Sequence, residues 1–225
     1  MSIAGEFETI ADAVYDKGKQ DEYDRFWDSF QKNGTLRFYG NAFSGNGWND
    51  ETFNPKYPIV TDVNVNRSNN VFVYSQITKI MCPLYFYDST SISTFANNYS
   101  LTKIGDDTGG GIWVTRNRTW ASNFSGCTKL EEVRFIDYNE KGEYVPSEIG
   151  NSIDFKNCTL LSVDSQVNII KHLVDYSTES TGTYTLTLHA DAWTRLEASE
   201  KTPQTEGIDF TGTWREYVSS LGWTT

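Results

Sequence analysis

Two apolar stripes near the start of the chain predict helix between about residues 6 and 31. Both repeat at helical spacing, the second in a new phase; they comprise Phe7, Ile10 and Val14, and then Tyr23, Phe26, Trp27 and Phe30. Gly18 separates the stripes, and Gly34 follows them as a stop signal. The phase change favours two short helical pieces, or one helix that turns its face, over a long coiled coil. We therefore expect residues 1–34 to be a helical attachment or oligomerisation segment.

The apolar pattern changes after residue 34. Residues 35–58 combine aromatic side chains with Gly and Asn, and turn signals stand at Asn46-Gly47 and Asn54-Pro55. We interpret this stretch as an aromatic cap on the domain that follows, so that residues 35–225 form one unit.

Short runs of β-branched and aromatic residues, divided by polar turns, continue from this cap and predict strands. They are Ile59–Val60, Val63–Val65, Val71–Tyr74, Leu84–Tyr87, Ile112–Val114 and Val133–Ile136. Such strands build either a sandwich or a solenoid, and an internal repeat separates the two.

A repeat is present in the middle of the chain. Its copies are Phe95–Ile104, Phe124–Val133 and Phe155–Val163, and Ile77–Ile80 is interpreted as the remnant of an earlier copy. In each full copy a Phe precedes a Leu by six positions, and the copies are spaced by 29 and 31 residues. This length lies at the upper end of leucine-rich repeats. We expect stacked coils whose Phe side chains form one column, with the Asn or Cys of each turn pointing inward.

The C-terminal part, residues 164–225, predicts an α/β cap. Its expected elements are a helix over Asp164–Val174 with Ser162 or Asp164 as N-cap, a strand over Tyr184–Leu188, a helix over Ala192–Ala198, and a short helix that opens on the capping box Thr213–Glu216 and stops at Gly222.

At these residues the sequence resembles the BspA-type leucine-rich repeats of bacterial surface proteins and of phage-encoded proteins. The resemblance is carried by Phe124–Leu130, Phe155–Leu173 and Thr185–Leu188, while Glu22–Gly34 and Ala42–Gly45 are similar to the opening of repeat proteins from prophage regions of gut bacteria. It covers about two thirds of the chain. It implies an α+β fold, namely an irregular leucine-rich-repeat solenoid of short β-strands, and an adhesive role on a virion or cell surface.

Charge and cysteine content narrow the function classes. A net charge of −11 argues against a nucleic-acid partner. Cys82, Cys127 and Cys158 are odd in number and far apart, which predicts buried free thiols rather than disulfides or a zinc site. The N-terminus lacks the pattern of a secretory signal, and no apolar run is long enough for a membrane span. We expect a protein made in the cytoplasm that reaches the surface as part of a virion.

No pattern recommends a catalytic residue, a metal ligand or a cofactor. His172 and His189 are interpreted as partly exposed structural histidines, and Asp106–Gly111 as a flexible turn, since it lacks the ligand spacing of a calcium loop and the lysine of a P-loop. Asp16, Asp21, Glu22, Asp24 and Asp28 are interpreted as a solvated acidic face.

Aromatic residues exceed what a thin solenoid core needs. Those expected to be exposed, and therefore to bind sugars or proteins, are Trp48, Tyr57, Tyr85, Tyr87, Trp113 and Trp120. The alternative, that most of them are core and cap residues, stays open.

The leading hypothesis is a non-enzymatic structural or receptor-binding protein of a phage tail, baseplate or particle surface. Residues 1–34 would join it to other virion proteins or to its own copies, and the repeat surface would bind a host glycan or protein. The alternatives are a bacterial cell-surface leucine-rich-repeat adhesin and, from another class, a small glycan hydrolase.

Overall fold

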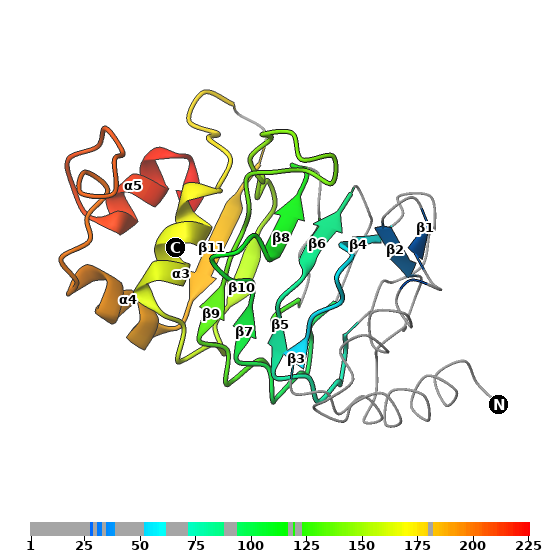
Figure 1. Ribbon diagram of the computed structural model, residues 1–225. Coiled ribbons are helices and arrows are strands. Elements are labelled where there is room, and N and C mark those ends of the chain that lie inside the picture. Colours follow the sequence, from blue (N-terminus) through cyan, green and yellow to red (C-terminus); the bar gives the residue numbers. More distant parts are fainter. Residues whose placement is uncertain are drawn as a thin grey trace.

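The chain folds as a mixed α/β protein in which short, mostly parallel strands stack beside one another, as the computed structural model shows (Figure 1). The structure describes residues 28, 31–32, 35–38, 52–61, 72–87, 94–116, 119, 123–179 and 182–225. Most of the helix predicted over residues 6–31 lies outside these ranges, and so does the strand predicted at Val63–Val65. Asp28 is helical as predicted, but Gln31–Lys32 is a strand that pairs with the first sheet, so the helical prediction for residues 1–34 is wrong at its end.

Two sheets run along the stack. The first has the order β1-β2-β4-β6-β8, with β1 at Gln31–Lys32, β2 at Thr35–Phe38, β4 at Ile59–Thr61, β6 at Pro83–Phe86 and β8 at Gly111–Val114. The second has the order β3-β5-β7-β9, with β3 at Thr52–Phe53, β5 at Lys79–Ile80, β7 at Lys103–Ile104 and β9 at Glu132–Val133. All neighbours pair in parallel except β1 and β2, which are antiparallel.

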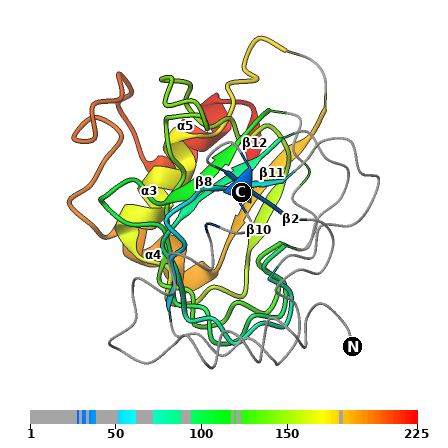
Figure 2. The ribbon, with the colours of Figure 1, turned by 45° about the vertical axis from the view of Figure 1, so that its right-hand side comes forward.

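The chain contributes strands to the two sheets alternately, and we call one strand of each sheet with its connections a passage. Thus β3 precedes β4, β5 precedes β6, and β7 precedes β8. The register repeats once per passage in each sheet: Leu84 lies between Ile59 and Ile112, and Lys103 lies between Lys79 and Glu132. Figure 2 shows these passages lying over one another. Strands that are neighbours in a sheet are therefore one passage apart in the sequence.

A column of phenylalanine rings runs through the core. The ring centroids of Phe95 and Phe124 lie 5.4 Å apart and those of Phe124 and Phe155 lie 4.3 Å apart, both pairs stacked. The predicted column is therefore confirmed, and it is longer than expected because Phe72 stacks on Phe95 at 5.9 Å. Phe53, from the segment interpreted as a cap, contacts Phe72 edge-on.

The strand predicted at Val71–Tyr74 is wrong over its described residues. Phe72–Tyr74 is a turn, and Tyr74 has a φ of 57°. Its counterparts two residues after the next two phenylalanines, Asn97 and Gly126, also have positive φ. Phe72 and Val73 of this run are therefore buried at a turn of the phenylalanine column, not in a strand.

The residue three positions after each of the last three phenylalanines points inward, as predicted. Asn98 donates its Nδ2 hydrogen to Ser75 Oγ at 2.7 Å, and the Cys127 thiol contacts the Phe95 carbonyl oxygen at 3.1 Å. Cys158 lies 3.9 Å from the Phe124 carbonyl oxygen in the same way. These side chains therefore bond to groups of the preceding turn that the tight curve leaves available.

The three cysteines are buried free thiols, which confirms that prediction. Burial raises the pKa of Cys127 to about 12 and also raises those of Cys82 and Cys158, so almost no thiolate forms near neutral pH. We expect Ellman's reagent at about pH 8 to modify no thiol in the native protein and all three after unfolding in guanidinium. A Leu160→Cys variant, with its thiol at an exposed position, should react at once and serves as the control. Rapid reaction of the native wild-type chain would contradict the burial of the three thiols.

The predicted C-terminal elements are confirmed with small shifts of their ends. They are α3 at Val163–Lys171 with Ser162 as N-cap, β11 at Tyr184–Leu188, α4 at Ala190–Glu197, and α5 at Trp214–Ser220 with the Thr213–Glu216 capping box. The structure adds β10 at Ile153–Phe155 and β12 at Trp223–Thr224, which flank β11 in a parallel sheet. These helices gather at one end of the stack (Figure 1).

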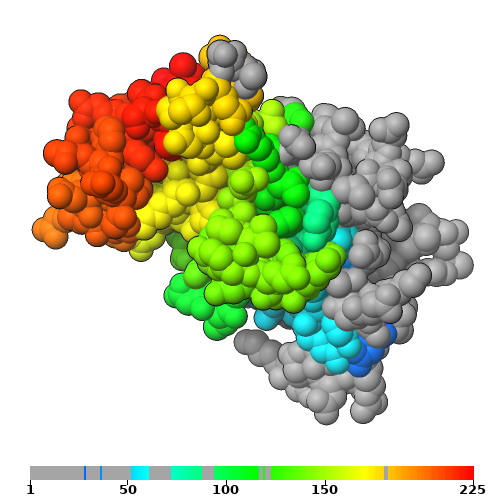
Figure 3. Space-filling view, turned by 90° about the horizontal axis from the view of Figure 1, so that it is seen from above, coloured from blue at the N-terminus to red at the C-terminus, as the bar shows by residue number. Residues whose placement is uncertain are grey.

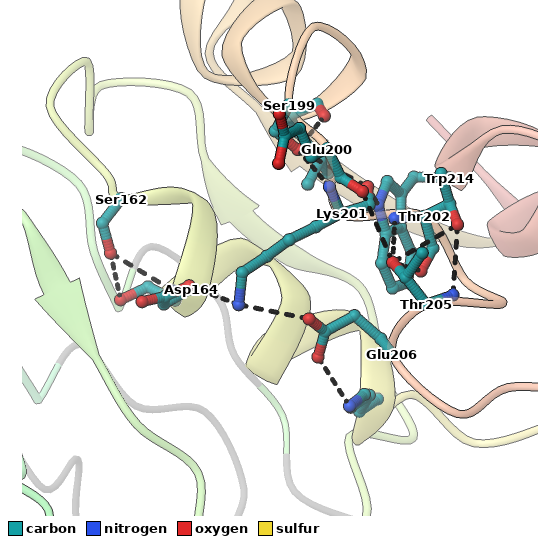
Figure 4. A network of polar contacts seen from close by, with 12 residues as sticks. Ser162, Asp164, Ser199, Glu200, Lys201, Thr202, Thr205, Glu206 and Trp214 are labelled. Atoms are coloured by element: carbon teal, nitrogen blue, oxygen red, sulfur yellow. Dashed lines mark hydrogen bonds and ion pairs between the residues drawn. The ribbon is translucent and has the colours of Figure 1, made fainter.

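A polar network fastens the loop between α4 and α5 to α3 (Figure 4). Lys201 Nζ lies 2.7 Å from Asp164 Oδ1 and 3.1 Å from Glu206 Oε1, and Lys171 Nζ lies 3.0 Å from the other oxygen of Glu206. The Trp214 indole N–H donates to the Lys201 carbonyl at 2.8 Å. The two lysines lower the pKa of Glu206 by donating to it, so this carboxylate stays charged within the network.

Side chains of α3 form hydrogen bonds with the backbone of β9 and of Phe135, at the end of the stack of parallel strands. Ser165 Oγ accepts from the Val133 N–H at 2.9 Å. Asn168 accepts from the Phe135 N–H at 2.6 Å and donates to the Phe135 carbonyl at 3.1 Å. The strand predicted at Val133–Ile136 is thus divided, since Val133 belongs to β9 whereas Phe135 forms a bridge to Ile112 of β8.

Candidate binding surface

An aromatic strip lies on the first sheet, outside the phenylalanine column. Pairing in register aligns Val60 of β4, Tyr85 of β6 and Trp113 of β8, and Ile136 completes a separate hydrophobic cluster. Tyr87 packs against it, with its ring 5.1 Å from that of Trp113. The structure therefore brings together three of the six aromatic residues that the sequence nominated for binding.

The expected exposure of that strip is wrong for two of its residues. Tyr85 is 7% exposed and Trp113 is 5% exposed, while Tyr87 is half-buried. The Trp113 indole N–H donates to the Val145 carbonyl at 2.7 Å. Burial raises the pKa of Tyr85, and the nearby negative charge of Glu140 adds to this effect. A segment distant in sequence therefore lies against the strip.

The remaining nominated aromatics do not join the strip. Tyr57 is half-buried against the main core, and its hydroxyl donates to Asp28, which also pairs with Lys56 at 2.7 Å. Asp28 is exposed, as expected of the acidic face, whose other members lie outside the described residues. Trp48 and Trp120 also lie outside them.

The segment against the strip is a hairpin at residues 137–146. Tyr138 and Tyr144 form an antiparallel bridge, and the Asn139 N–H donates to the Glu143 carbonyl at 3.0 Å. The Asn139 side chain accepts from the N–H groups of Lys141 and Glu143, and Gly142 supplies a φ of 75°. An Asn that bonds ahead to its own turn, followed by a Gly at positive φ, explains why this sequence reverses direction here.

The hairpin displays an exposed aromatic pair. Tyr138 is 54% exposed and Tyr144 is 68% exposed, and their ring centroids lie 5.5 Å apart in an edge-to-face arrangement. Val145 beside them is also exposed. Figure 3 shows the hairpin, in yellow-green, on the face turned to the viewer. Sequence reasoning missed this pair, although two tyrosines flanking an Asn-Glu-Lys-Gly turn would have indicated it.

A polar groove lies on the second sheet, beside the N-terminus of α3. It encloses about 440 Å³, and its walls include Lys103, Glu132, Arg134 and Asp107. These charged groups pair with one another along its lining: Lys103 contacts its strand neighbour Glu132, and Arg134 Nη1 lies 2.7 Å from Asp107 Oδ1. The groove is therefore lined by ion pairs that are already formed.

The turn at Asp106–Gly111, interpreted as a flexible turn, borders this groove and is tied by its own side chain. Asp106 Oδ1 accepts from the Thr108 N–H at 2.8 Å and from the Gly110 N–H at 3.1 Å. Arg134 also donates to the Asp106 carbonyl at 2.8 Å. The Asp106 side chain therefore stabilises the turn.

The two histidines occupy structural positions. His189 is the N-cap of α4 and accepts from the Asp191 N–H at 3.1 Å. His172 is buried rather than partly exposed, because Asp137 and the end of α3 enclose its ring. Among the residues that the structure describes, no group of three or more His, Cys, Asp or Glu is arranged to hold a metal ion. Within the same ranges, no helix has the length and apolar character needed to cross a bilayer.

No protein-family model, curated protein or solved structure matches this chain.

Proposed function

We propose that this chain is a non-enzymatic binding and structural protein of a virion surface, built on an irregular BspA-like leucine-rich-repeat solenoid. The 137–146 hairpin presents its tyrosine pair to a host glycan or protein. Residues 1–34 join the chain to other virion proteins or to its own copies. The assignment to a phage particle rests on the sequence resemblance.

Three repeating contacts support the solenoid. The parallel pairing returns once per passage in both sheets, the phenylalanine rings stack from Phe72 to Phe155, and the Asn or Cys of each turn bonds to the turn before it. A coil that buries its side chains only against its neighbours requires such contacts at every step. In this proposal residues 35–58 and 164–225 cap the two ends.

The observation that carries the binding role is the exposed pair Tyr138 and Tyr144. Tyrosine is enriched at binding interfaces because its ring offers a large apolar area with few rotatable bonds and a polar tip. The hairpin is already ordered by Asn139 and anchored through the Trp113 indole N–H, so little conformational entropy is lost when a partner docks. A bacterial cell-surface adhesin would use the same surface.

The charged groove favours a structural role over glycan hydrolysis. A glycosidase needs two carboxyl groups facing a substrate, one of them protonated and able to act as an acid. Here Glu132 and Asp107 each form an ion pair within the chain, with Lys103 and Arg134 respectively, so neither is a free carboxyl group facing a substrate. Release of reducing sugar from host cell-wall polysaccharide by the purified full chain would overturn the non-enzymatic assignment.

A double substitution tests the tyrosine pair. We expect Tyr138→Ala with Tyr144→Ala to weaken binding to intact bacterial cells and to arrayed surface polysaccharides at least about tenfold, as loss of a central aromatic anchor does. The melting temperature should stay near that of the wild type, because both side chains are largely exposed. Binding is measured with the labelled full-length chain.

The matched control is Tyr74→Ala with Tyr99→Ala. These tyrosines are 54% and 55% exposed but lie on the turns of the phenylalanine column rather than on the hairpin. The control should bind as the wild type does. Unchanged binding by the hairpin variant, or equal loss by both variants, would remove the hairpin from the proposed function.

A further inference from the structure

The rings of Tyr138 and Tyr144 have faces that no cation of the described part of the chain covers. A cation of this chain lies over other described rings, between 4.3 and 5.2 Å from the ring centroid; these rings are Tyr57, Tyr176 and Trp193. The face of an aromatic ring is the negative side of its quadrupole and attracts cations. The exposed tyrosine pair therefore offers a cation-attracting surface to a partner.

The charges around the pair are mainly negative. Residues 137–146 carry three carboxylates and one cation, Lys141, and the whole chain has a net charge of −11. Asn139 Nδ2 donates to Glu143 Oε2 at 2.8 Å, which fixes one of these carboxylates next to Tyr144 in the sequence. An anionic ligand would approach the hairpin against this field, whereas a cationic ligand is attracted by it.

The size of the exposed pair favours a sugar over a folded protein as the partner. Both rings are more than half exposed. An aromatic side chain has about 150–250 Å² to bury, so the pair offers on the order of 250 Å². A specific protein interface takes about 800 Å² from each partner. A pyranose ring is similar in size to a tyrosine ring, so the pair is large enough to cover a sugar unit.

We propose that Tyr138 and Tyr144 bind polysaccharides whose sugar units carry free ammonium groups. The carbon-bound hydrogens of the sugar lie on a tyrosine face, and its ammonium is attracted by the ring faces and by the Glu143 carboxylate. This inference rests on the proposed function, because it names the class of glycan that the hairpin binds. It goes further by assigning that glycan a positive charge.

A matched pair of oligosaccharides tests the charge of the ligand. Hexamers of glucosamine and of N-acetylglucosamine with the same linkage share one backbone, and acetylation removes the ammonium groups. Calorimetric titration of the full chain at about pH 6, where such amines are protonated, measures both affinities. We expect the glucosamine hexamer to bind at least about threefold more tightly, as for a cation over an exposed ring. The preference should shrink at about 1 M NaCl, where charges are screened.

Two variants locate the preference on the hairpin. Tyr138→Ala with Tyr144→Ala should weaken binding of the glucosamine hexamer at least about tenfold. Glu143→Gln keeps an oxygen that accepts from Asn139, so it should retain binding and lose at least about half of the preference between the hexamers. The matched control, Glu200→Gln, removes the same charge from an exposed position outside the hairpin and should leave the preference as in the wild type.

Equal or tighter binding of the N-acetylglucosamine hexamer would overturn the inference and leave the tyrosine pair as a binder of neutral glycans. Glucosamine binding that survives the double tyrosine substitution would also overturn it, because the acidic chain would then attract any polycation. Tighter binding of hexalysine than of the glucosamine hexamer would assign the pair to a basic protein segment instead. Failure of the proposed function has a separate readout, namely unchanged binding of the double tyrosine variant to intact cells.

Discussion

Replacing Phe124 with alanine is expected to lower the free energy of unfolding by about 3–5 kcal/mol. Phe124 is 1% exposed and stacks between Phe95 and Phe155, at 5.4 and 4.3 Å. Its removal leaves a cavity with ring faces above and below, and the pairing of β7 with β9 fixes the spacing between the passages that carry Phe95 and Phe124. The site therefore cannot collapse easily. Urea denaturation followed by circular dichroism measures the loss.

The control for this substitution is Tyr99→Ala on the preceding turn. Tyr99 is an aromatic residue four positions after Phe95, but its ring is largely exposed. It should change the free energy of unfolding by less than about 0.5 kcal/mol. If Phe124→Ala cost no more than this control, Phe124 would not be part of a continuous core.

Replacing Asn168 with leucine is expected to destabilise the protein by about 2–4 kcal/mol, since an unmade hydrogen bond costs about 1–3 kcal/mol per buried group. Asn168 bonds both the N–H and the carbonyl of Phe135, at 2.6 and 3.1 Å. Leucine has a similar size but satisfies neither group. Denaturation gives the free energy, and hydrogen exchange should show faster exchange at the Phe135 amide.

Asp164→Asn on the same helix is the matched control. Its side chain is exposed and keeps an oxygen for Lys201, so the change should stay below about 0.5 kcal/mol. A small effect of Asn168→Leu, with the Phe135 amide still protected, would mean that other groups close the end of the sheet.

The phenylalanine column could be predicted because it leaves a periodic trace. Phe95, Phe124 and Phe155 each precede a leucine by six positions, so the same contact recurs in the sequence. The first turn escaped that pattern because Ile77 follows Phe72 by five positions instead of six. The β-branched and aromatic composition of Val71–Tyr74 then favoured a strand. The C-terminal elements were predictable for a different reason, since their caps, such as Thr213 with Glu216, are local in sequence.

The binding surface was less predictable because it depends on which segments meet across the fold. Tyr85 and Trp113 have the composition of exposed anchors, yet a hairpin more than twenty residues further along the chain lies against them. The burial of His172 depends likewise on Asp137, which is 35 residues away. Neither relation repeats from one passage to the next, so no periodicity reveals it.

The way in which the hairpin leaves the scaffold has a consequence for how such a chain can diversify. Ser147, just after the hairpin, donates its hydroxyl hydrogen to the Ile136 carbonyl at 2.7 Å, and its oxygen accepts from the Val114 N–H at 3.3 Å. The two ends of the hairpin are thereby clamped to β8 and to each other. New recognition sequences could be exchanged between these fixed ends, as in a grafted loop, while the phenylalanine column beneath stays unaltered.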